Sequence, residues 1–195
     1  MVRAVAFDLM DTVFRDPFRE ALEAATGLSL TELFERREPG VYPAFERGEL
    51  DEDAYWAHYA DAGIAVDPVA FHEVRHEGIE FLPGMRELLD ELDGRIVRAT
   101  ASNYPVWVEE LAAGPLKGRF EHIVASYHLG VRKPDAAFYE RLLERIELPA
   151  DEVLFIDDRD ENVAGAQAVG IASHHFEDAP TLRAWLSAQG VPLAA

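Results

Sequence analysis

Short apolar segments that suit β-strands alternate along most of this chain with amphipathic segments that suit α-helices. The expected strands are 2–9, 95–102, 121–126, 152–157 and 170–176. The expected helices, where apolar residues recur with helical spacing, are 83–93, 105–114, 135–146, 161–170 and 179–190. Strands that alternate with helices form a parallel sheet with helices on both faces. The sequence therefore predicts an α/β protein built on a parallel sheet.

The long interval between the first two expected strands breaks this alternation. About 80 residues separate Val13 from the strand at 95–102, far more than one crossover helix needs. Segments of helical character fill the interval, at 17–27, 30–38, 42–48, 51–63 and 67–78. We therefore expect residues 15–82 to form a small helical cap domain, inserted into a core domain made of 1–14 and 83–195.

Composition and charge exclude several classes of function. The net charge of -19 argues against nucleic acid or an anionic membrane as a partner. The chain has no apolar run of about 18 residues, so we expect no membrane span, and its first residues do not have the pattern of a signal peptide. The absence of cysteine excludes disulfides, zinc–thiolate sites and cysteine nucleophiles. A cytoplasmic protein is the expectation, and the sequence carries no signal of an oligomeric state.

Polar side chains follow the expected strands at the point where each strand ends. They are Asp8, Ser102, Asn103, Asp157 and Asp158, together with Lys133 between the third strand and the next helix. In an open parallel sheet, ligands bind beyond the carboxyl ends of the strands. Lys133 is one of only two lysines in the chain, which favours a specific role for it. We therefore expect one site, at this edge of the sheet and beneath the cap.

Four short motifs lie at these strand ends. In chain order they are FDLMDT, ASN, RKPD and FIDDRDEN. Together they resemble the haloacid dehalogenase-like (HAD) hydrolase superfamily, and the resemblance covers nearly the whole chain. It implies a Rossmann-like, doubly wound core with a helical cap between the first two motifs, as the spacing also suggests. It further implies a Mg²⁺-dependent phosphatase whose partner is a small-molecule phosphate ester.

The same resemblance assigns roles to the acidic motifs. Asp8 matches the nucleophile that forms an aspartyl-phosphate. Asp8, Asp158 and the backbone carbonyl of Met10 match the ligands of Mg²⁺, an ion that prefers oxygen ligands. Asp157 matches a residue that supports the metal ligands without binding the ion, or one that interacts with the lysine. Asn162 either orients Asp158 or caps the helix that follows, and the two alternatives have equal support.

The basic and polar motifs match the residues that hold the phosphate. Lys133 corresponds to the lysine that stabilises the nucleophile and the phosphoryl oxygens. Ser102 and Asn103 correspond to the hydroxyl and amide that hydrogen-bond the phosphate, although a Ser-Asn pair is also ordinary turn chemistry. Tyr104 and Trp107 follow directly, and they either line a pocket for a flat substrate or pack beneath the cap.

Met10 departs from the pattern of the superfamily. Most of its phosphatases carry a second aspartate two residues after the nucleophile, which protonates the leaving oxygen and then activates water. Methionine cannot transfer a proton, and general acid–base catalysis contributes about 10² to 10⁴ in rate. Three alternatives follow. In the first, the protein is a phosphatase in which Asp11, assigned here as the acid/base, Asp16 or a metal-bound water carries the proton. In the second it is a 2-haloacid dehalogenase, and in the third a weakly active or non-catalytic binding protein.

A narrower resemblance favours the phosphatase. The stretches FDLMDTVFRDPF, SNYPVW and RKPDAAFY are similar to a group that includes flavin mononucleotide (FMN) hydrolases of plant plastids. The resemblance implies FMN or a related phosphomonoester as a candidate substrate. A magnesium-binding Asp157-Asp158 pair is typically absent from the dehalogenase branch, which also favours the phosphatase.

Overall fold

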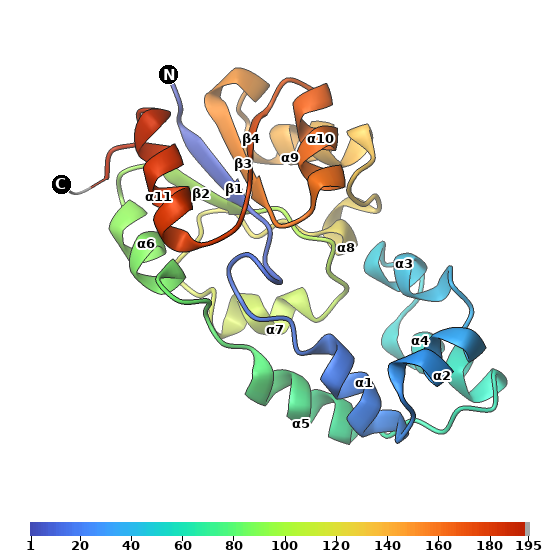
Figure 1. Cartoon of the computed structure of the whole chain (residues 1–195). Helices are drawn as coiled ribbons and strands as arrows, with labels where there is room; N and C mark the ends of the chain where they lie inside the picture. Colours follow the sequence, from blue (N-terminus) through green and yellow to red (C-terminus); the bar gives the residue numbers. More distant parts are fainter. Residues whose placement is uncertain (194–195) are drawn as a thin grey trace.

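A computed structural model describes residues 1–193, and its centre is a four-stranded parallel sheet (Figure 1). The strands are β1 (Ala4–Phe7), β2 (Val97–Thr100), β3 (Val153–Asp157) and β4 (Ala172–His175). Their order is β2-β1-β3-β4, with every neighbouring pair parallel. The predicted α/β fold class is confirmed.

Helices cover both faces of the sheet because both faces are apolar. Val5 and Phe7 of β1 point into one buried cluster, where α6 (Met85–Leu92) and α11 (Ala179–Ala188) pack. Ala4 and Ala6 point into the other, where α9 (Ala136–Ile146) packs, with α10 (Asp160–Ala168) beside it. Successive side chains of a strand face opposite sides, so a continuously buried strand reads as an unbroken apolar run.

One predicted strand, 121–126, is not a strand of the sheet. The segment runs along the outer edge of β2 and makes only isolated bridges to it. The side chain of Thr100 causes the interruption, because its hydroxyl donates to the carbonyl of Val124 and accepts from the amide of the same residue. A side chain thereby takes the place of part of the backbone ladder.

The chain between β1 and α6 forms five helices on the far side of the strand ends (Figure 1). They are α1 (Phe18–Thr26), α2 (Leu30–Arg36), α3 (Val41–Glu46), α4 (Glu52–Asp61) and α5 (Pro68–Gly78). The entering and leaving segments run side by side, since Arg15 N–H donates to Glu80 O and Leu82 N–H donates to Val13 O. The domain boundaries at 15 and 82 stay a prediction.

Side chains that cap the first turn explain where three of these helices begin. Ser29 accepts from the amide of Glu32, and Glu32 bonds back to Ser29, which is a capping box. Asp51 and Asp67 accept from amides in the first turns of α4 and α5. The remaining helical elements are α7 (Val108–Ala113), α8 (Ser126–Leu129) and the 3₁₀ turn Ala150–Glu152. Within residues 1–193, no helix has the length and apolar composition needed to cross a bilayer.

Candidate active site

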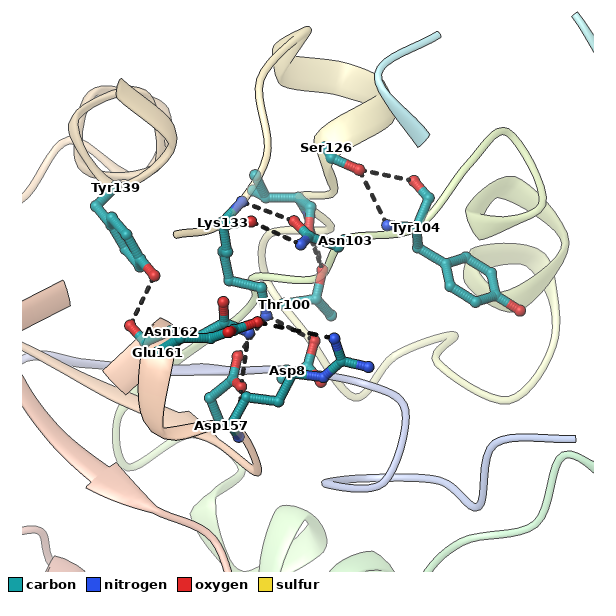
Figure 2. A network of polar contacts seen from close by, with 12 residues as sticks. Asp8, Thr100, Asn103, Tyr104, Ser126, Lys133, Tyr139, Asp157, Glu161 and Asn162 are labelled. Atoms are coloured by element: carbon teal, nitrogen blue, oxygen red, sulfur yellow. Dashed lines mark hydrogen bonds and ion pairs between the residues drawn. The ribbon is translucent and has the colours of Figure 1, made fainter. Parts of the chain in front are cut away.

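The ammonium group of Lys133 lies between two carboxylates at the carboxyl ends of β1 and β3 (Figure 2). Its Nζ atom is 2.8 Å from Asp8 Oδ1 and 2.5 Å from Asp157 Oδ2. All three side chains are at least nine-tenths buried. Asp8 follows β1 directly and Asp157 ends β3, so the adjacent positions of these strands bring the two carboxylates together, and Lys133 reaches them from the loop between α8 (Ser126–Leu129) and α9.

The electrostatics of this cluster follow from one cation serving two anions. Burial raises the pKa of Asp8 above its ordinary value, Lys133 lowers it and Asp157 raises it again, with a net upward shift. Burial by itself lowers the pKa of Lys133, but the two carboxylates outweigh that effect and raise it. Lys133 therefore remains a charged ammonium between the two carboxyl groups.

Asn103 fixes the backbone of Lys133 (Figure 2). Its Nδ2 donates to the carbonyl of Lys133 at 3.0 Å, and its Oδ1 accepts from the amide of Lys133 at 2.8 Å. The sequence predicts a phosphate contact for Asn103, whereas the structure commits its carbonyl oxygen and one amide hydrogen to Lys133. The second amide hydrogen is what Asn103 can offer a phosphate.

Asn162 holds Asp157 and not Asp158. Its Nδ2 donates to Asp157 Oδ1 at 2.9 Å, and the same oxygen accepts from the backbone amide of Arg159 at 3.0 Å. Asn162 also lies inside α10, whose N-cap is Arg159. Neither alternative predicted for Asn162 is therefore observed. With Lys133 on its other oxygen, Asp157 is fully engaged, as expected for a residue behind a metal site.

Three carboxylates, from Asp8, Asp157 and Asp158, have oxygen atoms within 4.8 Å of one another. Burial and the charges of Asp8 and Asp157 raise the pKa of Asp158 to about 6. Among residues 1–193, no backbone amide bonds to the carbonyl of Met10. Two buried carboxylates and one half-buried carboxylate, with an unused carbonyl beside them, form a donor set that suits a hard divalent cation such as Mg²⁺.

A cavity of about 700 Å³ opens above these carboxylates. Asp8, Ser102, Asn103, Lys133 and Asp158 line its floor, and residues of α1, α2 and α3 line the opposite wall. Seven acidic and five basic residues border it, so acidic groups outnumber basic ones around the cavity. An anionic ligand therefore needs a cation at the acidic floor.

Tyr104 and Trp107, for which the sequence left pocket lining and packing beneath the cap as alternatives, have different positions in the structure. Tyr104 lines the cavity, and its hydroxyl is 3.4 Å from Arg75 Nη1. Trp107 does not line it, since its side chain is buried among aromatic rings of the cap such as Phe45 and Phe71. Packing beneath the cap, the second alternative from the sequence, describes Trp107.

Asp11 and Asp16, the two aspartates that follow Met10, lie in one loop at the edge of the cavity. Asp11 is exposed and has a backbone φ of 58°, in the left-handed region that favours glycine but tolerates aspartate. Its Oδ1 accepts from the backbone amide of Asp16 at 3.2 Å. The carboxylate of Asp11 thereby stabilises the loop.

Sequence reasoning missed a carboxylate that α3 places in the cavity wall. Glu46 is 4% exposed, and its Oε2 lies 2.9 Å from Nε of Arg132, the residue before Lys133. Burial raises the pKa of Glu46 to about 7, although Arg132 opposes the shift. The charged residues in the segment PAFERGEL are typical of an exposed helix end, so the local sequence does not indicate that Glu46 is buried in the cavity wall.

Comparisons with known proteins agree with this geometry. The chain matches the sequence profile of the haloacid dehalogenase-like hydrolases over residues 2–170. Flavin mononucleotide hydrolase 1, a chloroplast protein of Arabidopsis thaliana, is 33% identical over 187 residues, which cover 95% of this chain and 76% of that protein. The sesquiterpene phosphatase astK of Aspergillus oryzae is 49% identical over 59 residues, 30% of each chain.

A solved structure shows that the fold is shared. A HAD family enzyme of Bacteroides thetaiotaomicron, in complex with magnesium and inorganic phosphate, has a TM-score of 0.77 and 18% identity to this chain. The superposition covers 93% of this chain and 99% of that one. The resemblance expected from the four motifs is confirmed, and the chain belongs to the haloacid dehalogenase-like hydrolases.

Proposed function

We propose that this protein is a Mg²⁺-dependent phosphatase that hydrolyses a small phosphomonoester through an aspartyl-phosphate on Asp8. The observation that carries the proposal is the buried arrangement in which Lys133 bonds Asp8 and Asp157 while Asp158 stands beside them. This arrangement combines a nucleophile with a fixed cation and a set of oxygen ligands.

Asp8, Asp158 and the carbonyl of Met10 would hold the ion, which offsets the charge between the phosphate and the carboxylates when it is bound. Asp8 attacks phosphorus through Oδ2, because its Oδ1 accepts a hydrogen bond from Lys133. Lys133 can contact the phosphoryl oxygens from the same position, and Ser102 and Asn103 donate to them from the end of β2. Water hydrolyses the aspartyl ester and restores Asp8.

The cavity supports a substrate of small-molecule size. Its volume of about 700 Å³ lies within the usual range for ligand pockets, roughly 300–1,000 Å³. Aromatic and arginine side chains of the cap, among them Phe18, Tyr42 and Arg37, line the wall away from the carboxylates. FMN is the first substrate to test, because the relative with 33% identity is named as an FMN hydrolase.

The experiment measures phosphate release from 4-nitrophenyl phosphate and from a panel of esters that includes FMN, with and without Mg²⁺. We expect Mg²⁺-dependent turnover that is lost in Asp8→Asn. Wild-type activity in Asp8→Asn would remove Asp8 from its role. Halide release from a 2-haloacid without phosphatase activity would favour a dehalogenase, and a folded protein inactive on both classes would favour a binding protein.

A further inference from the structure

The cavity contains carboxylates that the proposed nucleophile and metal site do not use. A phosphoryl transfer to Asp8 places the attacking and leaving oxygens in line, on opposite faces of phosphorus. Asp8 lies at the end of β1, so the leaving oxygen faces the opposite wall of the cavity, which residues of α1, α2 and α3 line. A proton donor for that oxygen is therefore sought on the cap side, where Met10 supplies none.

Four of the remaining acidic side chains of the cavity are poorly suited to donate this proton. Asp11 is exposed and its Oδ1 holds the loop. Glu20 pairs with Arg15, and Glu23 accepts from the amide of Leu30. Glu46 is held beside Arg132.

Asp16 is the exception, because its carboxylate is half-buried at the junction between the core and α1. Its Oδ1 accepts from the backbone amide of Phe18 at 2.9 Å. No described residue donates a hydrogen bond to its Oδ2, so one carboxyl oxygen remains available to a ligand. The cavity wall thus offers a fixed carboxyl group with one free oxygen.

The charges around Asp16 also favour its protonated form. Burial raises the pKa of Asp16, the Phe18 amide lowers it, and the charges of Asp11, Asp8 and Glu20 raise it, with a net upward shift. The Asp16 charge in turn raises the pKa values of Tyr42 and Tyr104, which line the same wall. Asp16 therefore lines the same cavity as Asp8, Tyr42 and Tyr104 and interacts electrostatically with all three.

We propose that Asp16 is the catalytic residue that carries the proton in place of the aspartate that Met10 replaces, an inference that rests on the proposed phosphatase function. In the first step Asp8 bonds to phosphorus, the ester P–O bond breaks, and the leaving oxygen takes the proton of Asp16. In the second step the Asp16 carboxylate takes a proton from water, the water oxygen bonds to phosphorus, and the Asp8–phosphorus bond breaks. The products are an alcohol and phosphate, with Asp8 ionised and Asp16 protonated again.

Asp16→Asn tests the proposal, because asparagine keeps the oxygen that accepts from Phe18 but cannot donate an acid proton. Proton donation matters most for a poor leaving group. We expect kcat/KM to fall about 100-fold or more for an alkyl phosphate, and far less for 4-nitrophenyl phosphate. Slow water attack should also give a burst of nitrophenol equal to the enzyme concentration, followed by slow turnover.

Two matched variants control for loss of charge in the same cavity. Glu20→Gln removes a neighbouring negative charge, and it should change kcat/KM only slightly and to the same extent for both substrates. Asp11→Asn is the rival, and a selective loss on the alkyl phosphate there but not in Asp16→Asn would overturn the inference. A thermal melt checks folding, and Asp16→Ser, which can also accept from Phe18, replaces Asp16→Asn if that variant does not fold.

The outcomes separate the two proposals. Equal losses on both substrates in Asp16→Asn, or no loss, would overturn the role of Asp16 while leaving the phosphatase intact. A folded wild-type protein with no Mg²⁺-dependent phosphate release would overturn the proposed function, and the role of Asp16 with it. A selective loss with a burst would support both.

Discussion

Asn103 and Lys133 are joined by two reciprocal hydrogen bonds, one from the Asn103 amide group and one to its carbonyl oxygen, although 30 positions separate them. The pair ties the loop after β2 to the loop that carries the ammonium group. It thereby sets the position of Lys133 between Asp8 and Asp157. The loop after β2 thus acts on the site through the lysine as well as through its own polar groups.

Removing this support should displace Lys133 without removing its charge. We expect Asn103→Ala to lower kcat by about 10- to 100-fold, on the scale by which residues that orient a functional group act. It should also lower the free energy of unfolding by about 1–3 kcal/mol, because a backbone donor and acceptor lose their partners. Steady-state kinetics and urea denaturation measure the two effects. Lys117→Ala, at the exposed second lysine, is the control and should match the wild type.

Removing the ammonium group leaves Asp8 and Asp157 buried without their cation. We expect Lys133→Met, which has a similar length, to abolish turnover and to destabilise the fold by about 3–5 kcal/mol at neutral pH. The loss of stability should shrink as the pH falls, because protonation of the carboxylates relieves their repulsion. Denaturation at pH 5 and pH 8 measures this difference. A stability loss that does not depend on pH would contradict the electrostatic explanation.

The buried Glu46 should make the protein less stable at alkaline than at acidic pH. Burial raises its pKa to about 7 from 4.5, so the folded state binds the proton more tightly than the unfolded state. The associated stability is complete below pH 4.5 and is lost as the pH rises to about 7, up to about 3 kcal/mol. Glu46→Gln should therefore be more stable than the wild type at pH 8 and similar at pH 4.5. Parallel unfolding curves at both pH values would argue against this shift.

Ion binding should depend on the ionisation of Asp158, whose pKa burial and the neighbouring aspartates raise to about 6. A metal ion competes with that proton, so the apparent affinity for Mg²⁺ should fall about tenfold for each pH unit below 6. Calorimetric titration with MgCl₂ at pH 5, 6 and 7.5 measures the trend. Asp158→Asn should lose the binding heat at every pH. Glu161→Gln, at a nearby exposed carboxylate, should retain it.

Trp107 should affect stability more than substrate binding. Its ring is 2% exposed and packs against the rings of Phe45, Trp56 and Phe71. Trp107→Ala should cost about 3–5 kcal/mol of unfolding free energy, as for other buried aromatic residues. Trp107→Phe should cost less and leave KM for the preferred ester unchanged. A raised KM in a stable Trp107→Phe protein would indicate that Trp107 contributes to substrate binding and would contradict this prediction.

Much of the fold was predictable because it depends on local patterns. The apolar runs around Ala4–Phe7 and Val153–Asp157 are long enough and buried enough on both faces to identify strands, and the predicted helices coincide with observed ones to within a few residues. The segment 121–126 was predicted wrongly, since its apolar letters do not reveal that Thr100 occupies its backbone groups. Side-chain competition for a backbone ladder is not visible in a hydrophobic pattern.

The sequence by itself determined the α/β class, the family and the acidic residues that follow β1 and β3, because each depends on residue types at short spacing. Only the tertiary structure decided which side chains meet. In the structure Asn162 donates a hydrogen bond to Asp157, and Asn103 is hydrogen-bonded to Lys133. Glu46 lines the cavity, and Trp107 does not. The physical reason is that the packing of the helices and sheet sets the distances between these side chains, and some of them, such as Asn103 and Lys133, are far apart in the chain. The burial that shifts the pKa values of Asp8, Asp16 and Asp158 arises from the same packing.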